Sequence, residues 1–316
     1  MISPRILVPL LLTGALGLGA CSSPSNADDL GSLTLNVGDQ IAGTEKVLAA
    51  AGELADVPYD ISWSAFTSGP PQIEALNAAQ IDFAITGNTP PVLGGNTDTT
   101  VITAYSNPAE GDAILLRPDS DITSVAELAG RSVAVARGSS AHGHLILQLE
   151  KAGVLVEDVT INYLPPSDGK AAFESGQVDA WAVWDPYTAL AELDGAVPLV
   201  TAAGVSNGFG FGVASDAALE DPLTSRALAD FTARVERAYA WARENPSAWA
   251  QVYATETRVD VAAAELNNRS LRTQIPLDER VVSSQNDLIG AFHRAGILPT
   301  GFDFADKIDT RFEENR

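Results

Sequence analysis

The residues best suited to chemistry stand in a stretch from residue 131 to residue 148, RSVAVARGSSAHGHLILQ. Residues 133–136 form a short apolar strand, Gly138 ends it, and Ser139 and Ser140 stand where a helix is expected to begin. The first N–H groups of a helix lack partners within the helix and lie at the positive end of its dipole. Together with two hydroxyl groups they can bind a small anion. The same pattern is also typical of an ordinary turn with a serine N-cap, so the stretch alone leaves both interpretations open.

Three further loops carry similar groups at points where strands are expected to end, at residues 38–44, 86–90 and 184–187. The candidate ligand-binding groups of the four loops are the amides of Gln40 and Asn88, the hydroxyls of Thr44, Thr86, Thr89, Ser139 and Ser140, and the rings of Trp184 and Tyr187. Uncharged donors suit a tetrahedral oxyanion, and flat rings suit an organic group beside it. The sequence therefore predicts a cleft for a small molecule.

Several charged or titratable residues lie near these loops, and the sequence leaves their roles open. His142 either donates a hydrogen bond to the anion or points into solvent, and Arg137 either pairs with the anion or is a surface residue. Asp39 and Asp185 would repel an anion that they faced. We therefore interpret Asp185 as a helix N-cap or a contact between lobes rather than as a direct ligand.

Motifs of common enzymes and metal sites are absent from the sequence. It has no nucleophile elbow, no Walker loop and no zinc-ligand spacing, and its one cysteine excludes a disulfide within the chain. The formal net charge of -22 and the lack of a basic stripe argue against nucleic acid as a partner. We therefore predict no catalytic residue, no metal and no cofactor.

The loops belong to a repeated alternation of strands and helices. The expected strands are residues 33–37, 59–66 and 81–85 in the first half of the chain and 133–136, 159–164 and 178–183 in the second. Asp82 and Asp179 each open the third strand of their set, and Asn88 and Asp185 follow six residues later, shortly before a proline. This correspondence predicts two similar α/β lobes with parallel strands, whose exit loops face a shared ligand crevice.

Two further strands, at residues 113–116 and 209–214, are expected to cross between the lobes. The tail after residue 223 is expected to be helical: Pro246 ends its first helix, and further helices cover about 259–269 and 278–296 and return to the first lobe. The predicted fold class is α/β. Its expected domains are lobe 1, from residues 32–114 and 210–316, and lobe 2, from residues 115–209, joined by a double crossover hinge.

The N-terminus carries an export signal. Arg5 precedes an apolar run at residues 6–18 that is too short to span a membrane, and LGAC and SSPSNADD follow. This arrangement resembles the lipobox of bacterial lipoproteins. It implies that residues 1–21 are a signal segment, that Cys21 is lipidated, and that residues 22–31 tether the protein to the outer face of the cytoplasmic membrane. A simple secretory peptide cleaved nearby is the alternative.

The assembled chain resembles the solute-binding proteins of ABC transporters for aliphatic sulfonates, within the nitrate/sulfonate/taurine family. The resemblance covers nearly all of the chain after residue 21 and is carried by VGDQ with Gly43 and Thr44, SGPPQIEALNAAQIDFAITGNTPP, VAVARGSSAHGHLILQLEKAG and LPPSDGKAAFESGQVDAWAVWDPY. It implies a type II periplasmic-binding-protein fold. The binding residues that it implies are Gln40, Asn88, Ser139, Ser140, His142, Trp184, Asp185 and Tyr187.

The sequence also departs from the family pattern. Asp39 stands where many relatives carry an aromatic residue, and Asn88 replaces a frequent aspartate. The sequence therefore leaves the identity of the ligand's organic tail open. The resemblance implies an exported, monomeric receptor that captures an aliphatic sulfonate and delivers it to a membrane permease. Alternatives are a receptor for taurine, nitrate, a sulfate ester or a thiamine-precursor pyrimidine, an enzyme of the same fold, and a surface adhesin or sensor lipoprotein.

Overall fold

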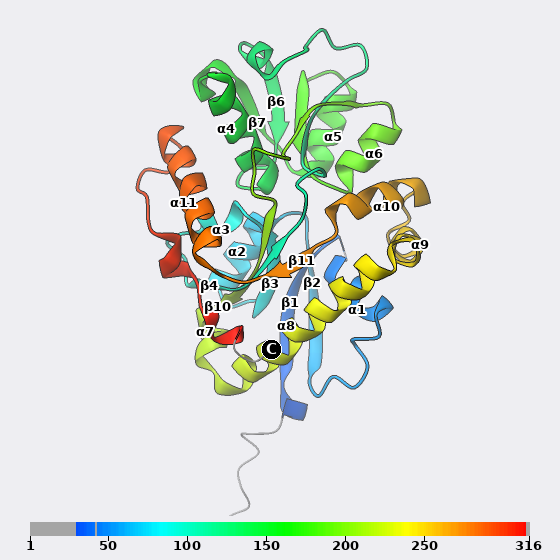
Figure 1. The fold of residues 1–316 in the computed structure, drawn as a ribbon, viewed down its shortest axis with the longest axis vertical. Coiled ribbons are helices and arrows are strands. Elements are labelled where there is room, and N and C mark those ends of the chain that lie inside the picture. Colours follow the sequence, from blue (N-terminus) through cyan, green and yellow to red (C-terminus); the bar gives the residue numbers. More distant parts are fainter. Residues whose placement is uncertain (1–29, 42, 314–316) are drawn as a thin grey trace, which may run out of the picture.

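The computed structural model describes residues 30–41 and 43–313, which form two lobes stacked along the long axis of the molecule (Figure 1). The expected signal segment, Cys21 and residues 22–29 of the expected tether lie outside these residues. None of the helices in the described part of the chain combines the length and the apolar character that a membrane span requires.

The lower lobe in Figure 1 contains a sheet of six strands in the order β11-β4-β10-β3-β1-β2. Its strands are β1 (Thr34–Gln40), β2 (Asp60–Phe66), β3 (Phe83–Gly87), β4 (Thr99–Ser106), β10 (Phe209–Ser215) and β11 (Thr273–Ile275). β2, β1 and β3 are parallel, whereas β10 is antiparallel to both β3 and β4. Its first helices are α1 (Gly43–Ala50), α2 (Gly69–Asn77) and α3 (Pro90–Leu93).

The upper lobe repeats this plan with five strands in the order β7-β6-β8-β5-β9. Its strands are β5 (Ala113–Leu116), β6 (Ser132–Val135), β7 (Thr160–Tyr163), β8 (Ala180–Val183) and β9 (Val197–Thr201), and its helices are α4 (Ser140–Ala152), α5 (Pro166–Glu174) and α6 (Tyr187–Leu193). β7, β6 and β8 are parallel, and β5 is antiparallel to β8 and β9. In each sheet the strand next to the parallel set, β10 or β5, follows directly after a strand of the other lobe. This arrangement confirms the predicted fold of two α/β lobes joined by two crossings.

The crossings lie at residues 107–112, between β4 and β5, and at residues 202–208, between β9 and β10. The expected boundary between residues 114 and 115 is therefore wrong, because it divides β5, whose four residues all pair within the second sheet. The expected return at residue 210 falls one residue inside β10.

The matching aspartates explain why the two halves of the sequence look alike. An Asp82 carboxylate oxygen accepts hydrogen bonds from the backbone N–H and the side-chain amide of Asn36, at 2.7 and 3.0 Å. An Asp179 oxygen accepts from the backbone N–H and the hydroxyl of Ser132, at 2.8 and 2.7 Å. Each aspartate thus joins the start of its strand to the neighbouring parallel strand. The C-terminal ends of the two strands are therefore aligned at the opposite edge of each sheet.

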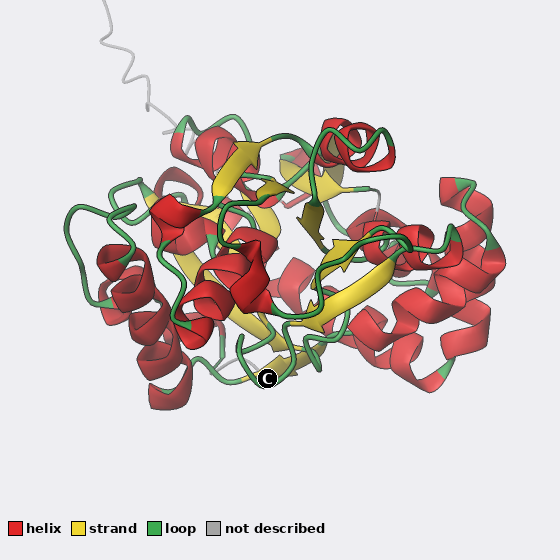
Figure 2. Cartoon of the chain, turned by 90° about the horizontal axis from the view of Figure 1, so that it is seen from above, coloured by secondary structure: helices red, strands yellow, loops and turns green. Residues whose placement is uncertain are grey.

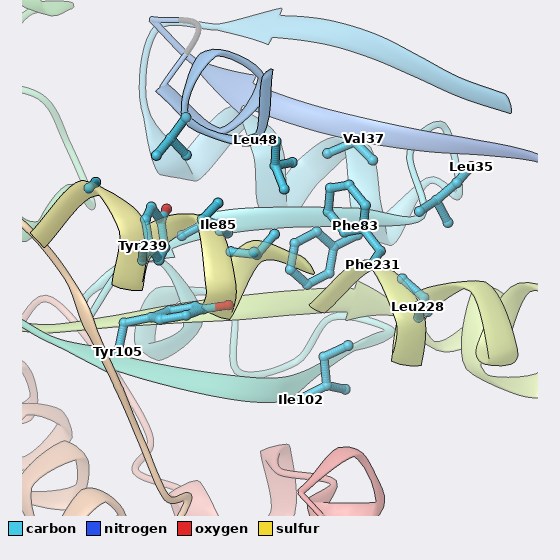
Figure 3. Close-up of a cluster of buried hydrophobic side chains, with 14 of the residues drawn as sticks. Leu35, Val37, Leu48, Phe83, Ile85, Ile102, Tyr105, Leu228, Phe231 and Tyr239 are labelled. Carbon is cyan, nitrogen blue, oxygen red and sulfur yellow. The ribbon is translucent and has the colours of Figure 1, made fainter. Parts of the chain in front are cut away.

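Apolar side chains of the first sheet pack under the long helix α8 (Pro222–Glu244) (Figure 3). Phe231 of α8 meets Phe83 of β3 edge to face, with 5.5 Å between ring centroids. Tyr239, two turns further along α8, meets Tyr105 of β4 in the same way at 5.3 Å. This contact brings the Tyr239 ring to the exit edge of the sheet. Viewed from above, helices flank both sheets (Figure 2).

The C-terminal helices only partly follow the expectation that they return to the first lobe. They are α7 (Asp216–Glu220), α8, α9 (Pro246–Thr257), α10 (Val261–Asn267) and α11 (Glu279–Arg294). α10 packs against α6 and α11 against α4, on opposite sides of the waist between the lobes (Figure 1). Pro246 follows the first long helix, as expected, and also begins α9, which the sequence interpretation missed together with β4, β9 and β11.

Candidate functional site: a cleft between the lobes

Two adjoining cavities of about 150 and 90 Å³ lie between the lobes, where the strands of both sheets end. Both are lined by Gln40, Trp184, Asp185, Ser270 and Arg272. Gln40 ends β1 of the first lobe, and Trp184 follows β8 of the second. The last two residues precede β11. The cleft is therefore built from strand exits of both lobes and from the C-terminal segment.

Most of the candidate binding residues meet at this cleft. The larger cavity is lined by Gln40, Thr44, Trp184 and Asp185, and the smaller one by Gln40, Asn88, Ser139, Ser140, Trp184 and Asp185. His142 and Tyr187 line neither cavity. Tyr187 instead packs edge to face against Trp184, with 6.1 Å between ring centroids, and so holds the indole in the cleft wall.

His142 is fully buried within the second lobe and does not reach the cleft. Its Nδ1 accepts a hydrogen bond from the backbone N–H of Gly138 at 3.1 Å, and its ring meets Tyr163 and Phe292 edge to face. Burial and the nearby charge of Arg137 lower the pKa of His142 to about 4. The imidazole is therefore neutral and supports the turn before α4, so neither expected role, donor to the anion or solvent-facing residue, fits its place.

Gln40 does not present the amide hydrogens that the sequence led us to expect. Its Nε2 donates to the side-chain oxygen Oε1 of Gln72 at 2.6 Å and to the Ile85 backbone oxygen at 3.1 Å. An amide nitrogen carries two hydrogens, so both are used. The polar atom of Gln40 that remains for a ligand is Oε1, an acceptor.

Asn88 is likewise committed to the protein. Its Nδ2 donates to the Ser206 hydroxyl at 3.0 Å and to the Asn207 side-chain oxygen at 2.8 Å, both on the second crossing. Its backbone oxygen accepts from Gln285 of α11 at 2.7 Å. Asn88 therefore ties the exit of β3 to the hinge and to the C-terminal region, and it shapes the cleft wall rather than offering donors to a ligand.

The N–H groups at the start of α1 are already bonded to a carboxylate of the protein itself, that of Asp39. The two carboxylate oxygens of Asp39 accept from the backbone N–H groups of Thr44 and Glu45, at 2.9 and 3.0 Å. Burial raises the pKa of Asp39, and these N–H bonds act against that rise. The start of α1 is therefore closed to an external anion.

The start of α4 remains open. The Ser139 hydroxyl donates to the Ala136 oxygen at 2.8 Å and accepts from the His142 N–H, so Ser139 caps the helix. Within the described residues, the backbone N–H groups of Ser140 and Ala141 have no acceptor. Ser140 also brings its hydroxyl to the smaller cavity. This helix start is therefore the one that can receive an anion.

Replacing each of the two serines with alanine should affect different properties, ligand affinity for Ser140 and stability for Ser139. Ser140→Ala is expected to weaken anion binding more than tenfold, because a hydrogen bond to a charged acceptor contributes about 1.5–3 kcal/mol. Ser139→Ala should instead cost about 1 kcal/mol of unfolding free energy through the lost N-cap and leave affinity nearly unchanged. Calorimetric titration and urea denaturation of both variants measure this. Equal losses of affinity would contradict the division of roles.

Arg272 is a candidate anion-binding residue that the sequence did not indicate. Its guanidinium is half-buried and lines both cavities, and Nη1 donates to the Tyr239 hydroxyl at 3.1 Å. Among the described residues no carboxylate lies within ion-pair distance of it. A partly desolvated charge is stabilised by a counter-ion, so Arg272 favours an anion in the cleft. The sequence feature that could have indicated it is the pair Arg269 and Arg272, three residues apart. Two arginines so close together stand out in a chain with 19 basic and 41 acidic residues.

Asp185 forms the contact between lobes that the sequence analysis favoured. Its carboxylate pairs with the Arg269 guanidinium in two bonds of 2.9 and 3.0 Å, accepts from the Ser270 hydroxyl at 2.7 Å, and accepts from the Ala189 N–H at 3.1 Å. Its side chain is 1% exposed. Arg269 also pairs with Glu192 at 2.9 Å. Asp185, one position before the N-cap Pro186, therefore accepts from the third residue of α6 and joins the second lobe to the C-terminal segment.

The lobes touch directly beside the start of α4. Gly143 lies so near the Thr89 hydroxyl of the first lobe that a Cβ there would collide with it. A Cβ on Gly87 would lie 2.9 Å from Cβ of Ser140. Glycine at these two positions lets the lobes close around the cavities.

Comparisons with known proteins agree with this architecture. The model of the NMT1-like family matches residues 33–254. An aliphatic sulfonates-binding protein of Bacillus subtilis (strain 168) is 31% identical over 260 residues, which cover 80% of this chain and 77% of that protein. Its namesake in Escherichia coli (strain K12) is 36% identical over 198 residues, so the match spans 61% of each chain.

Solved structures share the fold. The alkanesulfonate-binding protein SsuA from Xanthomonas axonopodis pv. citri bound to MOPS has a TM-score of 0.80 at 28% identity, with 88% of this chain and 98% of that chain covered. The desulfurization enzyme DSZB has a TM-score of 0.62 at 17% identity over 89% of this chain and 98% of that chain, which shows a common fold alone. Since the family model matches more than half of its length, the chain belongs to the NMT1-like family.

Proposed function

We propose that this protein is the substrate-binding component of an ABC importer and captures an aliphatic sulfonate in the cleft between its lobes. The observation that carries the proposal is the Arg272 guanidinium, which faces the cleft without a carboxylate partner among the described residues. The open N–H groups at the start of α4 line the same cleft from the opposite lobe. A sulfonate placed between them would be held by both lobes and would stabilise their closure.

The two cavities suit the two ends of such a molecule. The sulfonate group carries one negative charge on three oxygens and needs several donors, which Arg272 and Ser140 supply at the smaller cavity. The larger cavity is walled by the rings of Trp184, Trp249 and Tyr253, which offer apolar surface to an alkyl chain. The relatives named as aliphatic sulfonates-binding proteins support this choice of ligand.

A panel of ligands tests the proposal by thermal denaturation and calorimetry. The panel contains alkanesulfonates of increasing length, taurine, sulfate, nitrate and hydroxymethylpyrimidine. A sulfonate at one hundred times its dissociation constant should stabilise the fold by about 2.7 kcal/mol. Indifference to every sulfonate would refute the proposal, and a response to nitrate or to the pyrimidine alone would establish one of the alternative receptors.

We also propose that the protein is exported, lies at the outer membrane face through a lipid on Cys21, acts as a monomer, and passes its ligand to a permease. The lipobox resemblance at residues 18–21 supports the anchor. Mass spectrometry of the native N-terminus tests it, since an unmodified Cys21 would contradict it. An enzymatic role is the less favoured candidate: it rests on the shared fold of DSZB, whereas the curated relatives above are named as binding proteins.

A further inference from the structure

Three carboxylates line the cleft, and two of them have their hydrogen-bonding capacity filled by the protein. Asp39 accepts from two backbone N–H groups of α1. Asp185 accepts from Arg269, Ser270 and Ala189. The third carboxylate is Asp112, at the end of the first crossing.

Asp112 is held in place by the hinge, and none of the described cations forms an ion pair with it. Its backbone oxygen accepts from the N–H of Ala202 on the second crossing at 2.8 Å, so both crossings fix its position. Within the described part of the chain no cation lies within ion-pair distance of its carboxylate, and no backbone N–H bonds to it. The Ser140 hydroxyl hydrogen-bonds to the carboxylate, and the Arg272 charge acts on it from beyond ion-pair distance. Asp112 therefore faces the smaller cavity as a negative charge with spare acceptor capacity.

Arg272 lines the same small cavity, and the two opposite charges are not paired with each other. A plain alkanesulfonate satisfies the guanidinium but leaves its own charge close to Asp112. A ligand that carries both an anionic and a cationic group satisfies both residues. Gln40 adds an acceptor, because its Oε1 is the atom left free by its bonds to Gln72 and Ile85.

We propose that Asp112 makes the cleft select zwitterionic sulfonates, which carry an ammonium group on a short chain, over plain alkanesulfonates of the same length. This inference rests on the proposed function. Arg272 and the start of α4 hold the sulfonate, and Asp112 with Gln40 Oε1 accepts hydrogen bonds from the ammonium group. A zwitterion has no net charge, so it also enters a protein of formal charge -22 without long-range repulsion.

Titration of Asp112 should change the affinities for the two kinds of ligand in opposite directions. Burial raises the pKa of Asp112 to about 6, the nearby Asp185 raises it as well, and Ser140 and Arg272 act in the opposite direction. These three residues are the groups that face it, from the loop before α6, from α4 and from the segment before β11. A plain anion binds best when Asp112 is protonated, so its affinity should fall as pH rises from 5.5 to 7.5. A zwitterion binds best when Asp112 is ionised, so its affinity should rise over the same range.

Calorimetric titration with 2-aminoethanesulfonate and ethanesulfonate tests this, because the two probes differ only by the ammonium group. The full chain should prefer the amino compound at least tenfold at pH 7.5. Asp112→Asn should reduce that preference to within about threefold and should flatten the pH dependence of ethanesulfonate binding. Asp119→Asn is the matched control, since the Asp119 side chain is 87% exposed, and it should change neither property.

Equal affinity of the unmodified protein for the two probes at pH 7.5 would overturn the inference, and so would an unchanged preference in Asp112→Asn. Because the first comparison needs no variant, poor folding of Asp112→Asn would not protect the proposal. Binding of a longer alkanesulfonate without binding of 2-aminoethanesulfonate would refute the selection and leave the proposed function standing. Failure of every sulfonate would refute the proposed function itself.

Discussion

Replacing Arg272 with glutamine is expected to lower the affinity for sulfonates about thirtyfold or more. Removing one partner of a desolvated, hydrogen-bonded charge pair costs about 2–5 kcal/mol, because the remaining charge is left in a poorly solvated place. Here that remaining charge is the sulfonate, facing Asp112 in a cavity of about 90 Å³. Calorimetric titration of the variant with the best ligand of the panel measures the loss.

Two companion variants make this result specific. Arg137→Gln removes a cation that is exposed and lies over the Tyr163 ring, 4.3 Å from its centroid, outside both cavities, so affinity should stay within about twofold. Arg272→Lys keeps the charge but loses the planar fork of donors, and should recover part of the affinity. If Arg272→Gln binds normally while remaining folded, the anion lies elsewhere.

Replacing Asp185 with alanine is expected to lower the free energy of unfolding by about 3 kcal/mol, measured by urea denaturation. Breaking a buried pair by removing one partner costs about 3–5 kcal/mol. The lower end applies here, because Arg269 keeps its pair with Glu192 at 2.9 Å. The Ser270 hydroxyl and the Ala189 N–H also lose their acceptor.

The same variant separates the two roles considered for Asp185. As a contact between lobes, Asp185→Ala should lose stability in the absence of any ligand. The exposed carboxylate of Asp119, 3.8 Å from Arg117, serves as control, and Asp119→Ala should change stability by less than about 0.5 kcal/mol. A stable Asp185→Ala variant that no longer binds sulfonate would instead restore Asp185 as a direct ligand.

Local patterns in the sequence were sufficient to predict the two-lobed fold. Alternating apolar residues and proline or glycine punctuation placed most of the strands, and the spacing from Asp82 to Asn88 and from Asp179 to Asp185 revealed the repeat. The strands missed were β4, β9 and β11. β11 is three residues long and lies at the edge of the sheet beside β4, so its place depends on the chain folding back rather than on local propensity.

Which loops meet at the cleft was also predictable, because strand exits in open α/β sheets gather at one edge. The sequence indicated Ser139 and Ser140 from their place between a strand and a helix. It could not show that the Ser139 hydroxyl is used as the helix cap while the Ser140 backbone N–H stays without an acceptor among the described residues at the smaller cavity. That division depends on a single turn of helix and on which side faces the first lobe.

The sequence by itself determined the class of fold, the strand-exit loops and the residue types they offer, because these follow from short-range spacing. The tertiary structure alone decided which polar groups are free. Gln40, Asn88 and Asp39 are occupied by partners 32, 119 and 5 residues away, whereas none of the described carboxylates lies within ion-pair distance of Arg272. The hydrogen-bond partner of a polar group can lie anywhere in the chain. Which polar groups stay free to bind a ligand is therefore known only once the long-range contacts are known.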